Sequence, residues 1–106
     1  MAKYLFQARY TNEGGKGLMA EGGTGRRTAV EKAIAGIGGK LESFYFAFGE
    51  VDAYVIADLP DNVTAAAMAL AVNLSGRATT QTTVLMTPEE FDKATKKAVA
   101  YKPPGG

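Results

Sequence analysis

Residues 38–59 constrain the fold of this chain more than any other stretch. The pair Gly38-Gly39 ends one element, and an aromatic segment and a Val/Ile-rich segment then flank the short turn Gly49-Glu50-Val51-Asp52. Apolar side chains alternate in both segments, and this pattern predicts a β-hairpin that stops at Pro60. In its first strand we expect Phe44, Phe46 and Phe48 on one face and Leu41, Ser43, Tyr45 and Ala47 on the other.

Regular elements are also predicted before this hairpin. Residues 3–10 alternate as a strand, with Tyr4, Phe6, Ala8 and Tyr10 on one face. Residues 11–25 hold six of the thirteen glycines and are predicted to lack regular structure. A helix is expected next, capped by Thr24 and ended by the glycines at 36, 38 and 39. Its apolar stripe consists of Val30, Ala33, Ile34 and Ile37.

Three further elements are predicted after the hairpin. Asp61 is a suitable N-cap for a helix that runs to about Leu74, and the β-branched residues of 77–86 predict a fourth strand. Thr87 and Glu90 form a capping box at the start of a last helix, and Pro88 suits its first helical position. The apolar side of that helix is expected to consist of Phe91, Ala94, Ala98 and Tyr101.

The order of these elements predicts an α+β fold. Strand, helix, strand, strand, helix, strand is the order of a ferredoxin-like βαββαβ sandwich with a four-stranded antiparallel sheet, here with an extra C-terminal helix. The length fits one domain, which we place at residues 1–101, and residues 102–106 are expected to form a tail.

Composition excludes several function classes. The chain has no cysteine and no histidine, so His/Cys zinc sites, histidine-ligated haem and His- or Cys-based catalytic triads are ruled out. We therefore expect no cofactor and no metal. Net charge is +1 with dispersed basic residues, which argues against nucleic-acid binding. No apolar run is long enough to span a membrane and no signal peptide is recognisable, so a soluble, cytoplasmic protein is expected.

The predicted sheet has no strongly polar face. One face of the first hairpin strand carries phenylalanines, and the other still carries apolar side chains beside a few polar ones. A sheet face of this kind left in water would expose a large apolar patch, which usually marks an interface. We therefore expect a homodimer, or a higher even-numbered oligomer, that pairs through the sheet face.

Two acidic residues of the turn are candidates for proton transfer. Glu50 and Asp52 are separated by one residue and can act as acid and base or hold a divalent ion. The favoured interpretation is that they shape the hairpin, with Asp52 accepting backbone N–H bonds.

Further candidates concern ligand binding. Tyr45, with Arg9 and Gln7, can line a cleft that receives a planar or acidic molecule, although ordinary packing between subunits is the favoured interpretation. Arg26 follows a glycine-rich segment and can help to bind an anion at the start of a helix. That segment matches neither the P-loop nor the dinucleotide pattern, and a plain connection with a solvated arginine is favoured there.

Taken together, these segments resemble the GYD domain family, over almost the whole chain. Val51 is a departure, because it stands where the family has its signature tyrosine. The matching positions are Thr11, Gly14-Gly15, Arg26 or Arg27, Gly38-Gly39-Lys40-Leu41, Phe44-Tyr45, Gly49-Glu50, Asp52 and Thr87-Pro88-Glu89-Glu90-Phe91.

The resemblance implies a subunit of the dimeric α+β barrel type and no defined activity. That superfamily includes cofactor-independent monooxygenases, isomerases, haem-dependent enzymes and ligand-sensing domains, and its fold does not fix a function. We expect a homo-oligomeric domain that binds a small organic molecule between sheet and helices. Two alternatives stay open. One is a cofactor-independent enzyme acting on a small aromatic or quinone-like substrate through Asp52, Glu50 or Tyr45, and the other is a structural assembly protein.

Overall fold

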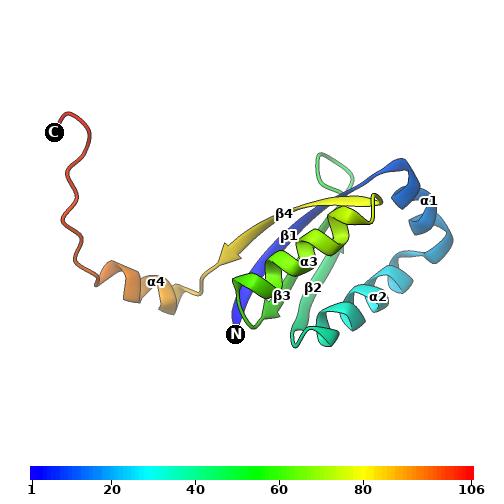
Figure 1. Ribbon diagram of the computed structural model, residues 1–106, viewed down its shortest axis with the longest axis horizontal. Coiled ribbons are helices and arrows are strands. Elements are labelled where there is room, and N and C mark those ends of the chain that lie inside the picture. The colour runs from blue at the N-terminus through cyan, green and yellow to red at the C-terminus, as the bar shows by residue number, and fades with distance from the viewer.

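The structure is a computed structural model that describes all 106 residues. Four strands form one antiparallel sheet in the order β2-β3-β1-β4, and four helices accompany it (Figure 1). This is the predicted α+β, ferredoxin-like arrangement. The elements are β1 (Ala2–Tyr10), α1 (Asn12–Glu21), α2 (Gly23–Gly36), β2 (Lys40–Phe46), β3 (Ala53–Leu59), α3 (Asn62–Leu74), β4 (Ala78–Leu85) and α4 (Pro88–Thr95).

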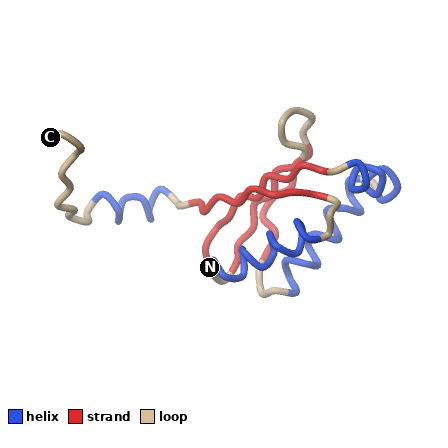
Figure 2. Tube along the Cα trace, turned by 45° about the horizontal axis from the view of Figure 1, so that its top comes forward, coloured by secondary structure: helices blue, strands red, loops and turns tan.

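Helices α2 and α3 both lie on the same face of the sheet (Figure 2). Helix α2 packs against edge strand β2, and α3 packs mainly against the opposite edge strand, β4. The main core lies at the end of the sheet where β1 begins, and there the Tyr4 hydroxyl donates to Asn62 Oδ1 at 2.6 Å. The buried core residues are Tyr4, Phe6, Ile34, Val55, Ala57, Leu59 and Ala65.

The prediction of irregular structure for residues 11–25 is wrong, because Asn12–Glu21 forms helix α1. The Thr11 side chain caps it by accepting from the Gly14 N–H at 3.2 Å. A Cβ on Gly14 would lie 1.8 Å from the Arg77 carbonyl oxygen, so only glycine permits this close approach. Docking against the start of β4 therefore outweighs the low helix propensity of the glycines.

Helix α2 (Gly23–Gly36) starts two residues earlier than predicted. Its N-cap is Gly22, at φ +80°, and no side chain caps it, so the expected Thr24 cap is wrong. The predicted caps of the later helices are confirmed. Asp61 accepts from the Thr64 N–H, and Thr87 and Glu90 form the capping box of α4.

The predicted faces of β2 are partly wrong because the strand contains a bulge. The register shifts between Leu41 and Ser43, so Leu41 pairs with the inward-facing Ala57 and packs against the core. Phe44 and Phe46 lie on the same inner face, opposite Val55 and Ala53. Phe48 lies beyond the strand and is fully exposed. A bulge changes the alternation by one residue, which simple counting cannot detect.

Residues 86–106, the C-terminal arm, extend away from the rest of the molecule (Figure 1). Helix α4 ends at Thr95, so the predicted apolar side through Ala98 and Tyr101 is not helical. The arm buries no residue in its helix, and its large side chains Phe91, Val99 and Tyr101 are exposed. Because the arm projects from the rest of the molecule, the radius of gyration is 16.8 Å, compared with about 13 Å for a compact domain of this length.

Candidate functional site

A partly open cleft of about 480 Å³ lies between the helices and the inner face of the sheet. Because α2 and α3 pack toward opposite edges of the sheet, a strip over the central strands is left between them. Small side chains line this strip: Ala8 and Ala53 on the strands, Ala33 on α2 and Ala71 on α3. The cleft therefore exists because alanines stand where large residues would otherwise fill the space between the two helices and the sheet.

Most of the residues that line the cleft are apolar, and the volume of the cleft is typical of small-molecule sites. The apolar residues toward the core include Phe6, Ile34, Phe44, Val55 and Met68. Helix α1 contributes Gly14, Gly17 and Leu18. The polar lining residues are Tyr10, Glu21, Arg26, Ser75, Arg77 and Thr80.

The two charged residues nearest the α1–α2 junction form a loose pair. Arg26 Nε lies 3.5 Å from Glu21 Oε1, and both side chains are about one-third exposed. That Nε is itself shielded from solvent and has no hydrogen-bond partner. Arg26, a candidate for anion binding from the sequence, lies on the wall of the cleft.

Tyr10 is the last inner-facing residue of β1 and also lines the cleft. Burial is the main cause that raises the pKa of its hydroxyl; Arg26 opposes this shift, and Asp52 and Glu21 add to it. The Tyr10 hydroxyl is therefore neutral at pH 7 and can donate a hydrogen bond to a molecule in the cleft.

Asp52 connects the hairpin to the end of β1. Its carboxylate accepts from the Tyr10 N–H at 2.9 Å, and its own N–H donates to the Ala8 carbonyl at 2.9 Å. Both contacts join the hairpin to β1, which is far away in the sequence, and neither is the local contact by which an aspartate shapes its own turn. Asp52 lines a shallow depression beside the cleft, together with Tyr10 and Leu18, and it does not line the cleft itself.

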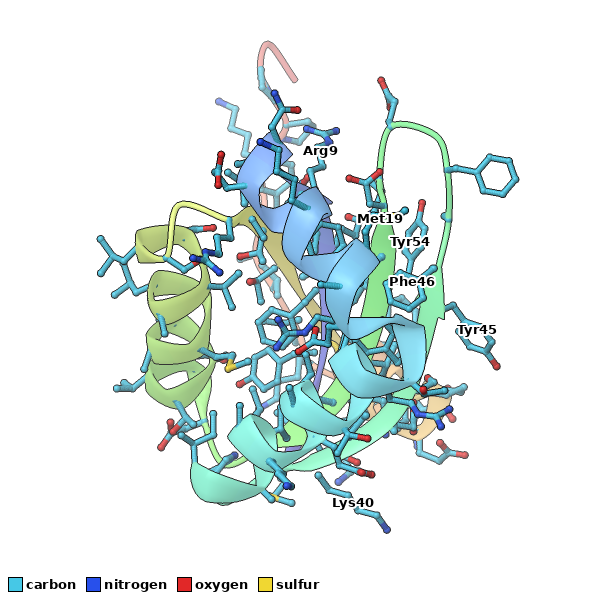
Figure 3. The ribbon with its side chains drawn as sticks, turned by 90° about the vertical axis from the view of Figure 1, so that its right-hand side faces the viewer. Arg9, Met19, Lys40, Tyr45, Phe46 and Tyr54 are labelled. Carbon is cyan, nitrogen blue, oxygen red and sulfur yellow. The ribbon has the colours of Figure 1, made fainter.

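The structure does not bring the other candidate residues to the cleft. Glu50 is exposed in the hairpin, where its carbonyl accepts from Arg9 Nε. Gln7, Arg9 and Tyr45 lie on the outer face of the sheet, the face without helices. Figure 3 shows the Tyr45 side chain pointing away from the helices. A role for these outer-face residues in ligand binding requires a partner on that face.

No local sequence signal joins the cleft residues Glu21 and Arg77 to Arg26. Glu21 and Arg77 lie in segments predicted as a loop and a strand start, so neither was connected with Arg26. The sequence places alanines at the inner-facing strand positions 8 and 53, but small residues alone do not predict a cavity, because a neighbouring side chain can fill the space. A large residue is usual where two helices cover the centre of a sheet, because interiors are closely packed.

Two properties bear on the class of protein. No group of three or more Asp, Glu, His or Cys side chains is placed to hold a metal ion. None of the helices has the length and apolar character needed to cross a membrane.

A family model, described as the GYD domain, matches residues 4–95. The chain belongs to the GYD domain family. No curated protein and no solved structure matches the chain. The matched span of this GYD domain includes β2, β3, β4 and the whole of α4, and all of β1 except its first two residues. Val51, in the turn between β2 and β3, is partly exposed, and the Asp52 carboxylate accepts from the Tyr10 N–H.

Proposed function

We propose that this GYD domain binds a small organic molecule in the cleft between the sheet and helices α2 and α3. The observation that carries the proposal is the cleft itself, a mostly apolar space of about 480 Å³ with a few polar side chains on its wall. Specific small-molecule sites have this composition, since the apolar surface supplies affinity and a few polar groups set orientation.

A neutral fluorescent probe tests this function. N-phenyl-1-naphthylamine fluoresces when it enters an apolar site, and we expect saturable binding to the wild-type protein. Ala71→Phe places a ring in the cleft and should abolish that binding. Ala67→Phe is the matched control, because Ala67 is on the same helix, exposed, and does not line the cleft. Equal loss in both variants contradicts the proposal, and so does the absence of saturable binding in the cleft by both this neutral dye and an anionic dye.

The alternative is a cofactor-independent enzyme, monooxygenase- or isomerase-like, acting on a small aromatic or quinone-like substrate. The observation that favours it is that two titratable groups, Tyr10 and Glu21, line the cleft. Tyr10 is suited to donate a proton or a hydrogen bond and Glu21 to accept one. Incubation with a set of naphthols and naphthoquinones, followed by mass spectrometry, tests this. A product that disappears in Tyr10→Phe, with probe binding unchanged, favours the enzyme.

We further propose that the protein is a homodimer, or a higher even-numbered oligomer, paired through the outer sheet face. Leu5, Tyr54 and Ile56 form an apolar band across the centre of that face and are only partly covered. At one end of the band Lys3 pairs with Glu42 at 2.6 Å and with Asp58 at 3.0 Å. An apolar centre with a charged border is the usual pattern of a protein interface.

The large exposed surface of the single chain also favours association between copies. A compact monomer of this mass exposes about 5,700 Å², whereas the isolated chain exposes 7462 Å². This excess in a single chain is larger than the roughly 800 Å² that each partner buries in a standard stable interface. Much of the chain that projects from the body belongs to the C-terminal arm, whose exposed apolar side chains a second copy would cover.

Sedimentation velocity of an interface variant tests this assembly. Ile56→Lys places a charge in the apolar band and should convert the oligomer to a monomer. Val84→Lys makes the same type of change at an exposed position on the opposite face of the same sheet, and should leave the oligomer intact. A wild-type protein that sediments as a monomer at micromolar concentration contradicts the proposal. An oligomer without any small-molecule binding would instead indicate a structural assembly protein.

A further inference from the structure

The polar groups of the cleft lie toward one end. Along β1 the inner-facing residues run Phe6, Ala8, Tyr10, and Phe6 belongs to the buried core. Tyr10 is four residues further on, about 13 Å at the usual rise of a strand, and it pairs with Ala78, the residue next to Arg77. Glu21 and Arg26 flank the α1–α2 junction, and the Arg26 charge acts on Tyr10. The cleft therefore has an apolar end and a polar end.

The polar end has an excess of positive charge. Arg26 and Arg77 are the basic residues of the lining, and Glu21 is its only acidic residue. Helix α2 also begins here, so the positive end of its dipole has the same sign as the two guanidinium groups. An anion at this end would be stabilised by all of these charges except that of Glu21.

Arg26 has an unused hydrogen-bond donor at this end. Its Nε is shielded from solvent and makes no hydrogen bond, because Glu21 Oε1, at 3.5 Å, is too far or poorly aligned. A shielded N–H of a charged group without an acceptor is unfavourable. A ligand oxygen beside Arg26 would supply the acceptor, and a carboxylate or sulfonate matches the fork geometry of a guanidinium group.

We infer that the ligand of the cleft is an organic anion: an apolar ring or chain that lies toward Phe6, with one carboxylate-like group that pairs with Arg26. This inference rests on the proposed binding function and adds the chemical class of the ligand. Arg26 is the residue that selects the charge of the ligand, and the alanine-lined strip accommodates the apolar part.

Two dyes that differ by one anionic group test the inference. N-phenyl-1-naphthylamine is neutral, and 8-anilinonaphthalene-1-sulfonate has nearly the same rings plus a sulfonate. We expect the wild type to bind the sulfonate dye at least about tenfold more tightly than the neutral dye, because a hydrogen bond to a charged arginine contributes at least this much affinity. Arg26→Gln should remove most of that preference while the affinity for the neutral dye changes less than about twofold.

Arg27→Gln is the matched control. Arg27 is the next residue of α2, is exposed and does not line the cleft, so its substitution should leave the affinities for both dyes nearly unchanged. The sulfonate dye also binds loosely packed apolar surfaces. Its binding is therefore assigned to the cleft only if Ala71→Phe abolishes the binding and Ala67→Phe does not.

The outcomes separate this inference from the proposed function. Cleft binding of both dyes with equal affinity overturns the inference and leaves the binding function standing. Equal loss of sulfonate binding in Arg26→Gln and Arg27→Gln also overturns it, because a general loss of positive charge would then be the cause. If neither dye binds in the cleft, the binding function and the inference fail together.

Discussion

Arg26 Nε lies 3.5 Å from Glu21 Oε1 across the junction of α1 and α2, and it forms no hydrogen bond there. Glu21 is thus close enough to weaken the positive field at this end of the cleft and too distant to satisfy the arginine. Any anionic ligand that pairs with Arg26 has to compete with this carboxylate.

Substitution of Glu21 should therefore strengthen anion binding. In Glu21→Gln the negative charge is removed while the shape of the side chain is kept, and we expect affinity for 8-anilinonaphthalene-1-sulfonate to rise about threefold to tenfold, the effect of one nearby charge in a partly exposed site. The affinity for the neutral dye should not change. Fluorescence titration measures both, and weaker sulfonate binding in Glu21→Gln would count against the pairing with Arg26.

Gly14 should be intolerant of a side chain. Gly14→Ala places a Cβ 1.8 Å from the Arg77 carbonyl oxygen, so α1 must move away from the start of β4. We expect the free energy of unfolding to fall by about 1–3 kcal/mol, as in other overpacked sites. Urea denaturation followed by circular dichroism measures this change.

Gly15→Ala is the control for that substitution. Nothing lies within 4 Å of a Cβ at Gly15, so alanine there should raise the free energy of unfolding by about 0.5–1 kcal/mol through its higher helix propensity. Equal destabilisation by the two substitutions would mean that α1 does not dock against Arg77.

Removal of the C-terminal arm should weaken association without unfolding the domain. A chain that ends at Met86 lacks α4 and the exposed Phe91 and Tyr101, none of which belongs to the core. We expect the dimer dissociation constant to rise at least about tenfold, as for loss of one buried aromatic anchor, with the strand and helix signal of the remaining domain retained. A chain that ends at Tyr101 is the control. Sedimentation equilibrium measures the dissociation constants of both chains. Equal dissociation constants would show that the C-terminal arm takes no part in association.

Asp61 should make part of the stability depend on pH. Hydrogen bonds from the Thr64 hydroxyl and then from the Thr64 N–H lower the pKa of this carboxyl below its ordinary value of 3.8. Since the folded pKa is the lower one, the stabilisation is present above pH 3.8 and is lost as the pH falls through the folded pKa. Asp61→Ala should therefore be less stable than the wild type at pH 7, and the difference should disappear in acid.

Thermal melts at two pH values measure this dependence. One is pH 7, and the other is about pH 2.5, near the range where protonation of linked carboxylates removes their contribution to stability. Asp92→Ala, an exposed aspartate of α4, is the control and should alter the melting temperature little at either pH. A difference between Asp61→Ala and the wild type that persists undiminished in acid would exclude the capping carboxylate as its cause.

Most of the fold could be predicted because its signals are local. Alternation identified the strands, and the caps at Asp61 and Thr87 identified the starts of two helices. Helix α1 could not be predicted in this way, because the requirement for glycine at position 14 comes from a contact with Arg77, more than sixty residues away in the sequence. The inward position of Leu41 was missed because it depends on a bulge, which the alternation does not encode.

The candidate site was harder to predict than the fold. Arg26 was identified from its place after a glycine-rich segment, but its partners Glu21 and Tyr10 come from other elements and meet it only through the tertiary structure. The cleft is present because the side chains at Ala8, Ala53 and Ala71 are too small to fill the space between the sheet and the helices. A small residue in a sequence pattern does not reveal whether a neighbour fills the space beside it.

The central claim is that the cleft between α2 and α3 holds a small organic molecule, and a crystal structure of the protein with 8-anilinonaphthalene-1-sulfonate tests it most directly. We expect the naphthalene rings between Ala33 and Ala71 and the sulfonate beside Arg26. Dye bound only on the outer sheet face or the C-terminal arm, with α2 and α3 closed over an empty centre, would contradict it.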